Sequence, residues 1–428
     1  MCFWGICQRR AYYGYDPNDY SMNQKRVRQS FGVAIVALGA ALTWGAPAWA
    51  QDSAAITSLH EAFERAAAQL PEAAASPALN AQADAQRRAS SGPFVGPPVA
   101  RGDVLTRSGG TIEQEASVSA AIKWPGEARA GVNAATLNRD AANSGLAAAQ
   151  LALAGDIRSA YWRLAGARSA VDIEAQHVAT ARIETDQVAR LVQAGVQARR
   201  DLLVSQAELG LALSRLSAAE SDLADTMAEV EALFGDAPGS FADEALSPRT
   251  DIEGHPALRA AETKAKAADA KAAYARYSTR PRVEGTVGVR RQRNDPRGSY
   301  EDALLVGIAV PLGRDSRAVA DAAGTRAEAL SAGAEAARLR ARLIAEQRAA
   351  LVRLSVAENA LVDAQARQSA LREALSLTER GRAEGEIGYI EYLRARQALF
   401  DAERDLGAAR VAKSAAISNV NQSMGVLP

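Results

Sequence analysis

The sequence predicts a mainly α-helical protein with a small β part. Three observations lead to this fold class: apolar residues recur every seven positions over long stretches, short segments alternate between apolar and polar residues, and the whole arrangement occurs twice. The composition agrees, because 48% of the 428 residues are hydrophobic but only 5% are aromatic. Most of the apolar content is alanine and leucine, which suits closely packed long helices better than a thick aromatic core.

Residues 22–50 have the pattern of a secretory signal peptide, and residues 1–21 are an extension or a wrongly assigned start. Basic residues lead into an apolar segment that is too short to span a bilayer. Ala48 and Ala50 then form an A-x-A cleavage site, so we expect the mature chain to begin near Gln51. Both cysteines precede this site, which excludes disulfides and a thiolate metal site from the mature chain.

The mature chain repeats itself. A shift of 190 residues places Gly195 on Gly385, and the sequences around them align without a gap. Each half contains strands, a Pro/Gly turn, a very long helix, a glycine-bearing break and a second helix. We predict a first repeat at 51–235, a linker at 236–254 and a second repeat at 255–428.

Long helices are predicted where one large and one small residue recur in every heptad, as in a coiled-coil seam. Leu202, Leu209 and Leu216 start one such series, and Ala212 and Ala219 are among its small companions. A helix of about 66 residues would extend about 100 Å, so it must be a rod that packs against other rods. The predicted long helices cover about 128–193, 201–234, 314–380 and 390–424.

Strands are predicted at about 94–123 and 282–310, where apolar residues alternate with small or polar ones. Eight to ten alternating residues are typical of a transmembrane barrel strand, although on alternation alone an ordinary half-buried hairpin explains them better. Prolines at 93, 97 and 98 interrupt the first strand, within a stretch expected to be flexible from about Ser90 to Gly110. We therefore expect that strand to be short, displaced or partly missing.

Each repeat also has a break between its two long helices, with a glycine followed six positions later by an acidic residue. The pairs are Gly195 with Asp201 and Gly385 with Glu391. Glycine can adopt the left-handed conformation that ends a helix. The acidic residue is expected to cap the next helix and to interact favourably with its dipole.

Together with the Pro/Gly turns after the strands, at 124–126 and 311–313, these features resemble the outer-membrane efflux proteins typified by TolC. The resemblance covers essentially the whole mature chain, and the turn of the first half looks more like the CzcC-like heavy-metal branch. It implies antiparallel coiled-coil helices that form an α-barrel, and four strands contributed to a transmembrane β-barrel shared by a homotrimer. It also implies an outer-membrane location with the helical part in the periplasm.

The resemblance further implies partners and contact residues. The partners are a periplasmic adaptor (a membrane fusion protein), an inner-membrane pump of the resistance-nodulation-division (RND) type, and outer-membrane lipid. The expected adaptor contacts lie at the two helical breaks: Gly195, Val196, Asp201, Leu202, Gly385, Glu391 and Tyr392. The alternative is that these residues only make the hairpin turns. Four carboxylates near the second break could form an acidic entrance ring or simply a solvated helix end: Glu373, Glu379, Glu384 and Glu386.

Signatures of enzyme chemistry are missing from the sequence. We find no nucleophile elbow, phosphate loop, Rossmann fingerprint or zinc motif, so no enzyme, cofactor or metal site is predicted. His177 is expected at a solvent-exposed helix position. The formal net charge is zero, which gives no electrostatic case for nucleic acid.

The function predicted from these features is a passive outer-membrane exit duct of a tripartite efflux system, with heavy-metal cations as one candidate substrate. The first alternative is the same kind of channel serving type I protein secretion. The second is of another class, a periplasmic coiled-coil scaffold or adaptor without a barrel.

Overall fold

The structure is a computed structural model that describes residues 58–428, apart from 109, 236–237, 239–240, 249–250 and 296. The predicted signal peptide, with Ala48 and Ala50, and the extension at 1–21 lie outside the described residues. The elements in chain order are α1 Leu59–Ala68, α2 Pro71–Ser91, β1 Val99–Thr106, β2 Ile112–Ile122, α3 Glu127–Gln193, α4 Arg199–Phe234, α5 Pro256–Ala275, β3 Val283–Arg293, β4 Glu301–Ala309, α6 Ser316–Ala383 and α7 Tyr389–Ser423.

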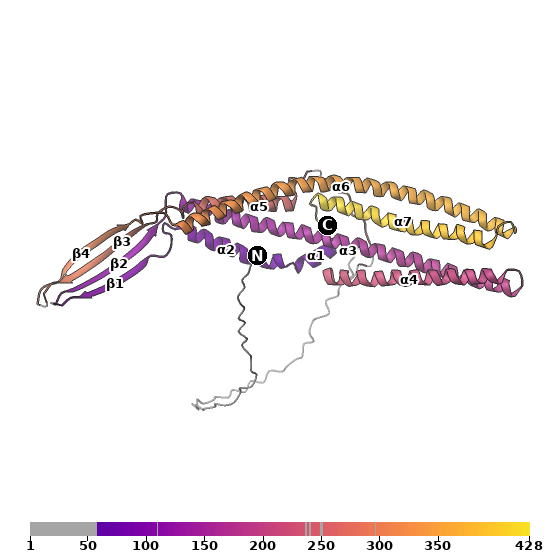
Figure 1. The fold of residues 1–428 in the computed structure, drawn as a ribbon, viewed down its shortest axis with the longest axis horizontal. Helices are drawn as coiled ribbons and strands as arrows, with labels where there is room; N and C mark the ends of the chain where they lie inside the picture. Colours follow the sequence, from indigo (N-terminus) through magenta and orange to yellow (C-terminus); the bar gives the residue numbers. More distant parts are fainter. Residues whose placement is uncertain (1–57, 109, 236–237, 239–240, 249–250, 296) are drawn as a thin grey trace, which may run out of the picture. The chain divides into compact units, whose positions relative to one another are not determined.

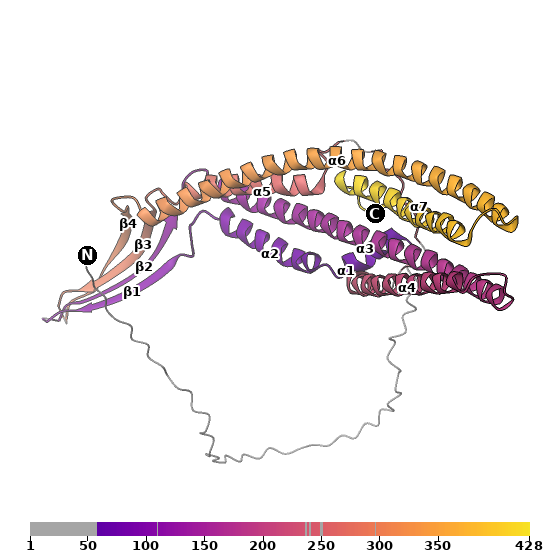
Figure 2. The same cartoon turned by 45° about the vertical axis from the view of Figure 1, so that its right-hand side comes forward.

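Two long helical hairpins dominate the fold, which confirms the predicted fold class. α3 has 67 residues and folds back into α4, and α6 has 68 residues and folds back into α7. In both views the two hairpins run side by side, with their turns at the end away from the strands (Figures 1 and 2). Small seam residues such as Ala212 and Ala402 are fully buried, as a closely packed coiled coil requires.

Three helices were not predicted: α1, α2 and α5. α2 and α5 each precede the strand hairpin of their repeat, and both pack along α3. They are rich in alanine and show little seven-residue spacing, and α2 also contains Pro77 within its helix. None of the helices in the described part of the chain is both long and apolar enough to cross a membrane.

The four strands form one antiparallel sheet in the order β1-β2-β3-β4. The two repeats meet at β2 and β3, which pair from Ile112↔Arg293 to Ile122↔Val283. The doubtful first strand is present, because β1 starts at Val99, after the interrupting prolines, and pairs along its whole length with β2. The expectation of a flexible stretch across this region was therefore wrong for residues 99–106.

A buried carboxylate fixes the sheet to the helical part. Glu127, the first residue of α3, is fully buried. Both of its carboxylate oxygens accept hydrogen bonds of 2.7 Å from Arg282, which directly precedes β3. The backbone N–H of Trp124 donates to the same carboxylate at 3.0 Å. Because these partners come from both repeats, the group joins the two strand hairpins to the start of α3.

The main core lies where α3 meets α1 and the ends of α4 and α7. Tyr161 and Trp162 on α3 are buried there and pack edge to face at 5.1 Å. The Trp162 indole N–H donates to the Ser418 hydroxyl of α7 at 2.7 Å. Arg158 is also buried, with hydrogen bonds of 2.7 and 3.0 Å to Glu244. This core holds the two hairpins together at their base.

Candidate functional site: helical tips and sheet

The first tip, residues 194–198, reverses the chain between α3 and α4. Gly195 has a φ of 74°, in the left-handed region that glycine adopts most easily. The N–H of Val196 donates to the carbonyl of Leu191 at 2.9 Å, which closes the end of α3. The Val196 side chain is 74% exposed, whereas Leu202 is only partly exposed. The tip therefore presents one prominent apolar side chain to its surroundings.

The second tip, residues 384–388, has the same geometry. Gly385 has a φ of 84°, and the N–H of Glu386 donates to the carbonyl of Gly381 at 2.9 Å. Arg382 lies over the rings of Tyr389 and Tyr392, at 4.9 and 4.5 Å from the ring centres. Burial raises the pKa of both tyrosines. Sequence reasoning found Tyr392 but missed Tyr389 and Arg382.

The acidic residues do not cap the returning helices, contrary to the prediction. The N-cap positions belong to Ala198 and Gly388, which have no side-chain acceptor. Asp201 and Glu391 instead occupy the third helical position, because α4 begins at Arg199 and α7 at Tyr389, two residues before each acidic residue. There they still lie near the positive end of the helix dipole. Asp201 also accepts a hydrogen bond of 3.3 Å from the Gln197 side chain.

The four predicted entrance carboxylates, Glu373, Glu379, Glu384 and Glu386, are all exposed. Two of them lie within the second tip, and Glu391 follows just after it. The first tip is flanked instead by Arg199 and Arg200, also exposed. The two tips of one chain therefore carry opposite charge.

Ion pairs lock the two hairpins together near the tips. Arg396 of α7 pairs with Glu184 of α3, and both side chains are buried. Arg404 pairs with Glu174 of α3 at 2.7 Å, and Gln397 donates to Glu208 of α4 at 2.9 Å. Burial lowers the pKa of Arg396 to about 10. Sequence reasoning missed this network, because its partners lie far apart along the chain.

His177 belongs to the same interface, and the expectation that it is solvent-exposed was wrong. Its side chain is buried, and its ring lies 3.8 Å from the Phe400 ring, centre to centre. Its Nδ1 lies 3.5 Å from a carboxylate oxygen of Glu174. Burial lowers the pKa of His177. The ring packs in a helix interface, and no group of three candidate metal ligands occurs among the described residues.

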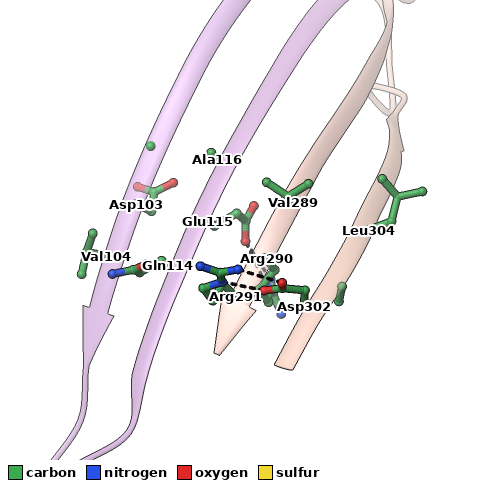
Figure 3. A pocket seen from close by; sticks show the side chains of 12 residues that line it. Asp103, Val104, Gln114, Glu115, Ala116, Val289, Arg290, Arg291, Asp302 and Leu304 are labelled. Carbon is green, nitrogen blue, oxygen red and sulfur yellow. Dashed lines mark hydrogen bonds and ion pairs between the residues drawn. The ribbon is translucent and has the colours of Figure 1, made fainter. Parts of the chain in front are cut away.

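The sheet has one apolar and one polar face. The side chains of one face are apolar and at least half exposed: Val104, Val118, Val287, Val289, Leu304, Val306 and Ile308. The opposite face carries charge, where Arg290 binds Glu115 at 2.9 Å and Glu113 at 3.2 Å. A hollow of about 840 Å³ crosses all four strands, and most of its lining residues, such as Val104, Arg291 and Leu304, belong to the apolar face (Figure 3). Exposed apolar residues on this scale mark a contact surface rather than an ordinary solvated face.

Solved structures with the same fold include outer-membrane proteins and outer-membrane channels. The chain resembles VceC from Vibrio cholerae at 17% identity and a TM-score of 0.70, over 86% of this chain and 96% of VceC. For CusC the identity is 16% and the TM-score 0.69, over 87% and 93% of the two chains. For the open MtrE channel of Neisseria gonorrhoeae the identity is 17% and the TM-score 0.66, over 87% of this chain and 90% of MtrE. At these identities, the similarity establishes the fold. No curated protein matches the chain in sequence.

The family assignment comes from the sequence itself. The family model described as outer membrane efflux protein matches residues 53–236 and 248–426, and these two segments fit the internal repeat. The chain therefore belongs to the outer membrane efflux protein family. The proteins of this family are passive channels of the outer membrane and not enzymes, and they generally work with adaptors and inner-membrane pumps.

Proposed function

We propose that this protein is the exit duct of a tripartite efflux system, a homotrimer whose sheets share one barrel in the outer membrane and whose helices extend into the periplasm. The observation that carries the proposal is the four-stranded sheet with an exposed apolar face. Such a face is costly in water and favourable against lipid hydrocarbon. The charged opposite face then lines the aqueous lumen.

The sheet edges support the trimer. Within the described residues, β1 and β4 each pair on one side only, so two rows of backbone donors and acceptors stay open. Open strand edges are not tolerated in the hydrocarbon of a membrane. Four strands are too few to close a barrel, whereas three copies joined from β1 to β4 would close one of twelve strands.

The helices support the same assembly. The outer half of α6 exposes Val352, Val356 and Val362, each more than 60% exposed. α4 exposes Leu203 and Leu211 along its length. In a trimer these apolar residues would be covered by the hairpins of the neighbouring copies, which would complete a tube.

The tips are proposed to meet the periplasmic adaptor, and an RND-type pump is proposed to load the duct. Val196 and Leu202 offer apolar contact at the first tip, with Gly195 and Asp201 shaping its turn. At the second tip Gly385, Glu391 and Tyr392 take the equivalent positions. The exposed carboxylates there would favour cations, which agrees with heavy-metal ions as the exported substrate.

Membrane insertion can be tested with two adjacent variants of β3. Val287→Arg places a charge on the apolar face and should reduce the amount of trimer in the outer membrane, because an arginine facing the membrane interior costs about 2–4 kcal/mol. Thr286→Arg, on the opposite face, should insert normally. The readouts are membrane fractionation and conductance in planar bilayers. A soluble wild-type protein without conductance would instead support the periplasmic scaffold.

A further inference from the structure

Two arginines and a tyrosine form a stack at the hairpin end of the sheet. Arg291 and Arg293 lie on β3, two and four residues beyond Val289, and strand alternation places all three on the apolar face. Tyr300 precedes β4 and contacts both arginines, with its ring centre 5.6 Å from the Arg291 guanidinium and 5.0 Å from that of Arg293. The stack is accessible, because the Tyr300 residue is 43% exposed and the Arg291 side chain 55%.

A similar group lies at the other end of the apolar face. There Arg280 lies 5.9 Å from the Trp124 ring centre and 5.0 Å from that of Tyr277. The apolar residues of β3 begin at Val283, so about 26 Å of strand separates this end from Arg291 at 3.3 Å per residue. Because barrel strands tilt by about 35–45°, this length corresponds to an apolar band about 20 Å tall, a little less than the roughly 25 Å of membrane barrels, and aromatic residues flank it at both ends as they do in such barrels.

The charges of the stack favour an anion at the hairpin end. Figure 3 shows Arg291 paired with Asp302 beyond Val289 and Leu304, on the side of the hairpin ends. This pair, at 2.7 and 2.9 Å, uses Nε and Nη2 of Arg291 and leaves its Nη1 outside the pair. The Nε of Arg293 is buried and has no hydrogen-bond partner in the structure. Arg291, Arg293 and Asp302 together carry a net positive charge.

We propose that Arg291 and Arg293, which both contact the ring of Tyr300, bind the phosphate group of a glycolipid in the outer leaflet of the outer membrane. The inference rests on the proposed function, because the hairpin end faces the outer leaflet only if the helices point into the periplasm. Acyl chains would lie along Val289 and Leu304, and the phosphate would accept hydrogen bonds from the solvent-facing sides of the two guanidinium groups, such as Nη1 of Arg291. Arginine suits this role because its planar fork forms paired hydrogen bonds with phosphate.

The test uses the full-length protein purified as a trimer in detergent. Native mass spectrometry would measure the binding of diphosphorylated lipid A and of the same lipid after removal of its phosphates. The wild type should bind the phosphorylated lipid more tightly. Arg293→Gln should weaken that binding about fivefold, the value for one lost basic residue near an anionic lipid surface. Asp302→Asn should strengthen it, because it removes the carboxylate that competes for Arg291.

Arg101→Gln is the matched control. Arg101 lies on the polar face of the same sheet, so its loss removes one positive charge without touching the stack. An equal loss of binding in Arg101→Gln and Arg293→Gln would overturn the inference. A wild-type trimer that binds the phosphorylated and the dephosphorylated lipid equally tightly would also overturn it. A protein that forms no trimer and does not enter membranes would refute the proposed function instead.

Discussion

Arg396 of α7 and Glu184 of α3 form an ion pair that is buried between the two helical hairpins. The residues are 212 positions apart in sequence, and each comes from a different repeat. Taking two charges out of water is costly, and the cost is offset only while both partners are present. The pair therefore fixes how the two hairpins lie against each other.

We predict that Glu184→Gln lowers the free energy of unfolding by about 3 kcal/mol, because it leaves the Arg396 charge buried without its counterion. Arg396→Met in the same chain should recover most of the loss. The exposed pair of Arg163 and Glu229 is the control, and Glu229→Gln should cost less than about 1 kcal/mol. Thermal unfolding measures all three variants. Equal losses in Glu184→Gln and Glu229→Gln would refute a special role for the buried pair.

The stability of the helical interface should fall with acidification. Burial lowers the pKa of His177 below its usual 6.5. The nearby Glu174 carboxylate acts in the opposite direction, whereas the positive charges of Arg215 and Arg396 lower the pKa further. The folded protein thus keeps this ring neutral, while the unfolded chain begins to bind a proton at about pH 6.5. The contribution of neutral His177 to the stability of the folded protein is complete above that pH. It is lost as the pH falls toward the pKa of His177 in the folded state.

His177→Gln should therefore flatten the decline of the melting temperature between about pH 7 and pH 5. The decline should not vanish, because burial also lowers the pKa of His255 and acts in the same direction. Melting curves of wild type and variant over this range measure the effect. If the melting temperatures of wild type and variant fall equally steeply with pH, His177 does not contribute to the pH dependence of stability.

The tip glycines can be tested within a single turn. Gly385 has a φ of 84°, whereas Gly388, three residues later, has a φ of −75°, and an added Cβ would meet open space at either position. Gly385→Ala should cost about 1 kcal/mol through backbone strain alone. Gly388→Ala should be nearly neutral. Export in cells should fall only for the bulkier Gly385→Val, and unchanged export would count against an adaptor contact at this tip.

Charge reversal tests the proposed acidic entrance. Replacing Glu384 and Glu386 together by lysine should shift single-channel selectivity from cations toward anions, because both side chains are exposed at the second tip. Glu72→Lys, on α2 and distant in sequence from the tips, is the control. Reversal potentials in a salt gradient measure the shift. Equal reversal potentials in the wild type, the double variant and Glu72→Lys would show that these carboxylates do not form an acidic entrance ring.

Much of the fold could be predicted because periodic burial leaves a mark in the sequence. Seven-residue spacing of leucine and alanine follows from helices packed side by side, so the long helices were recognisable. α5 offered no such mark, because its alanine-rich sequence packs between two helices without a large residue in each heptad. β1 was hidden for a different reason. Its prolines precede Val99 and remove no hydrogen bond from the sheet.

The site was less accessible to sequence reasoning. The tip glycines follow from local turn geometry, which a sequence displays directly, whereas the capping role predicted for Asp201 and Glu391 was wrong. Arg396 and Glu184 meet only because the two repeats fold against each other, and neither residue has a local signal. His177 has polar and apolar neighbours in sequence, which do not show where its ring lies, and its helix turns it toward Phe400 of the other repeat.

Disulfide cross-linking between sheet edges tests the central claim most directly. No cysteine follows residue 7, so cysteines introduced at Val104 of β1 and at Leu304 or Val306 of β4 would report only on each other. These positions belong to the opposite edge strands of one sheet and come together only between copies. We predict a covalent trimer on a non-reducing gel of the outer-membrane fraction for at least one cysteine pair. A protein that stays monomeric for every pair, in a soluble periplasmic fraction, would contradict it.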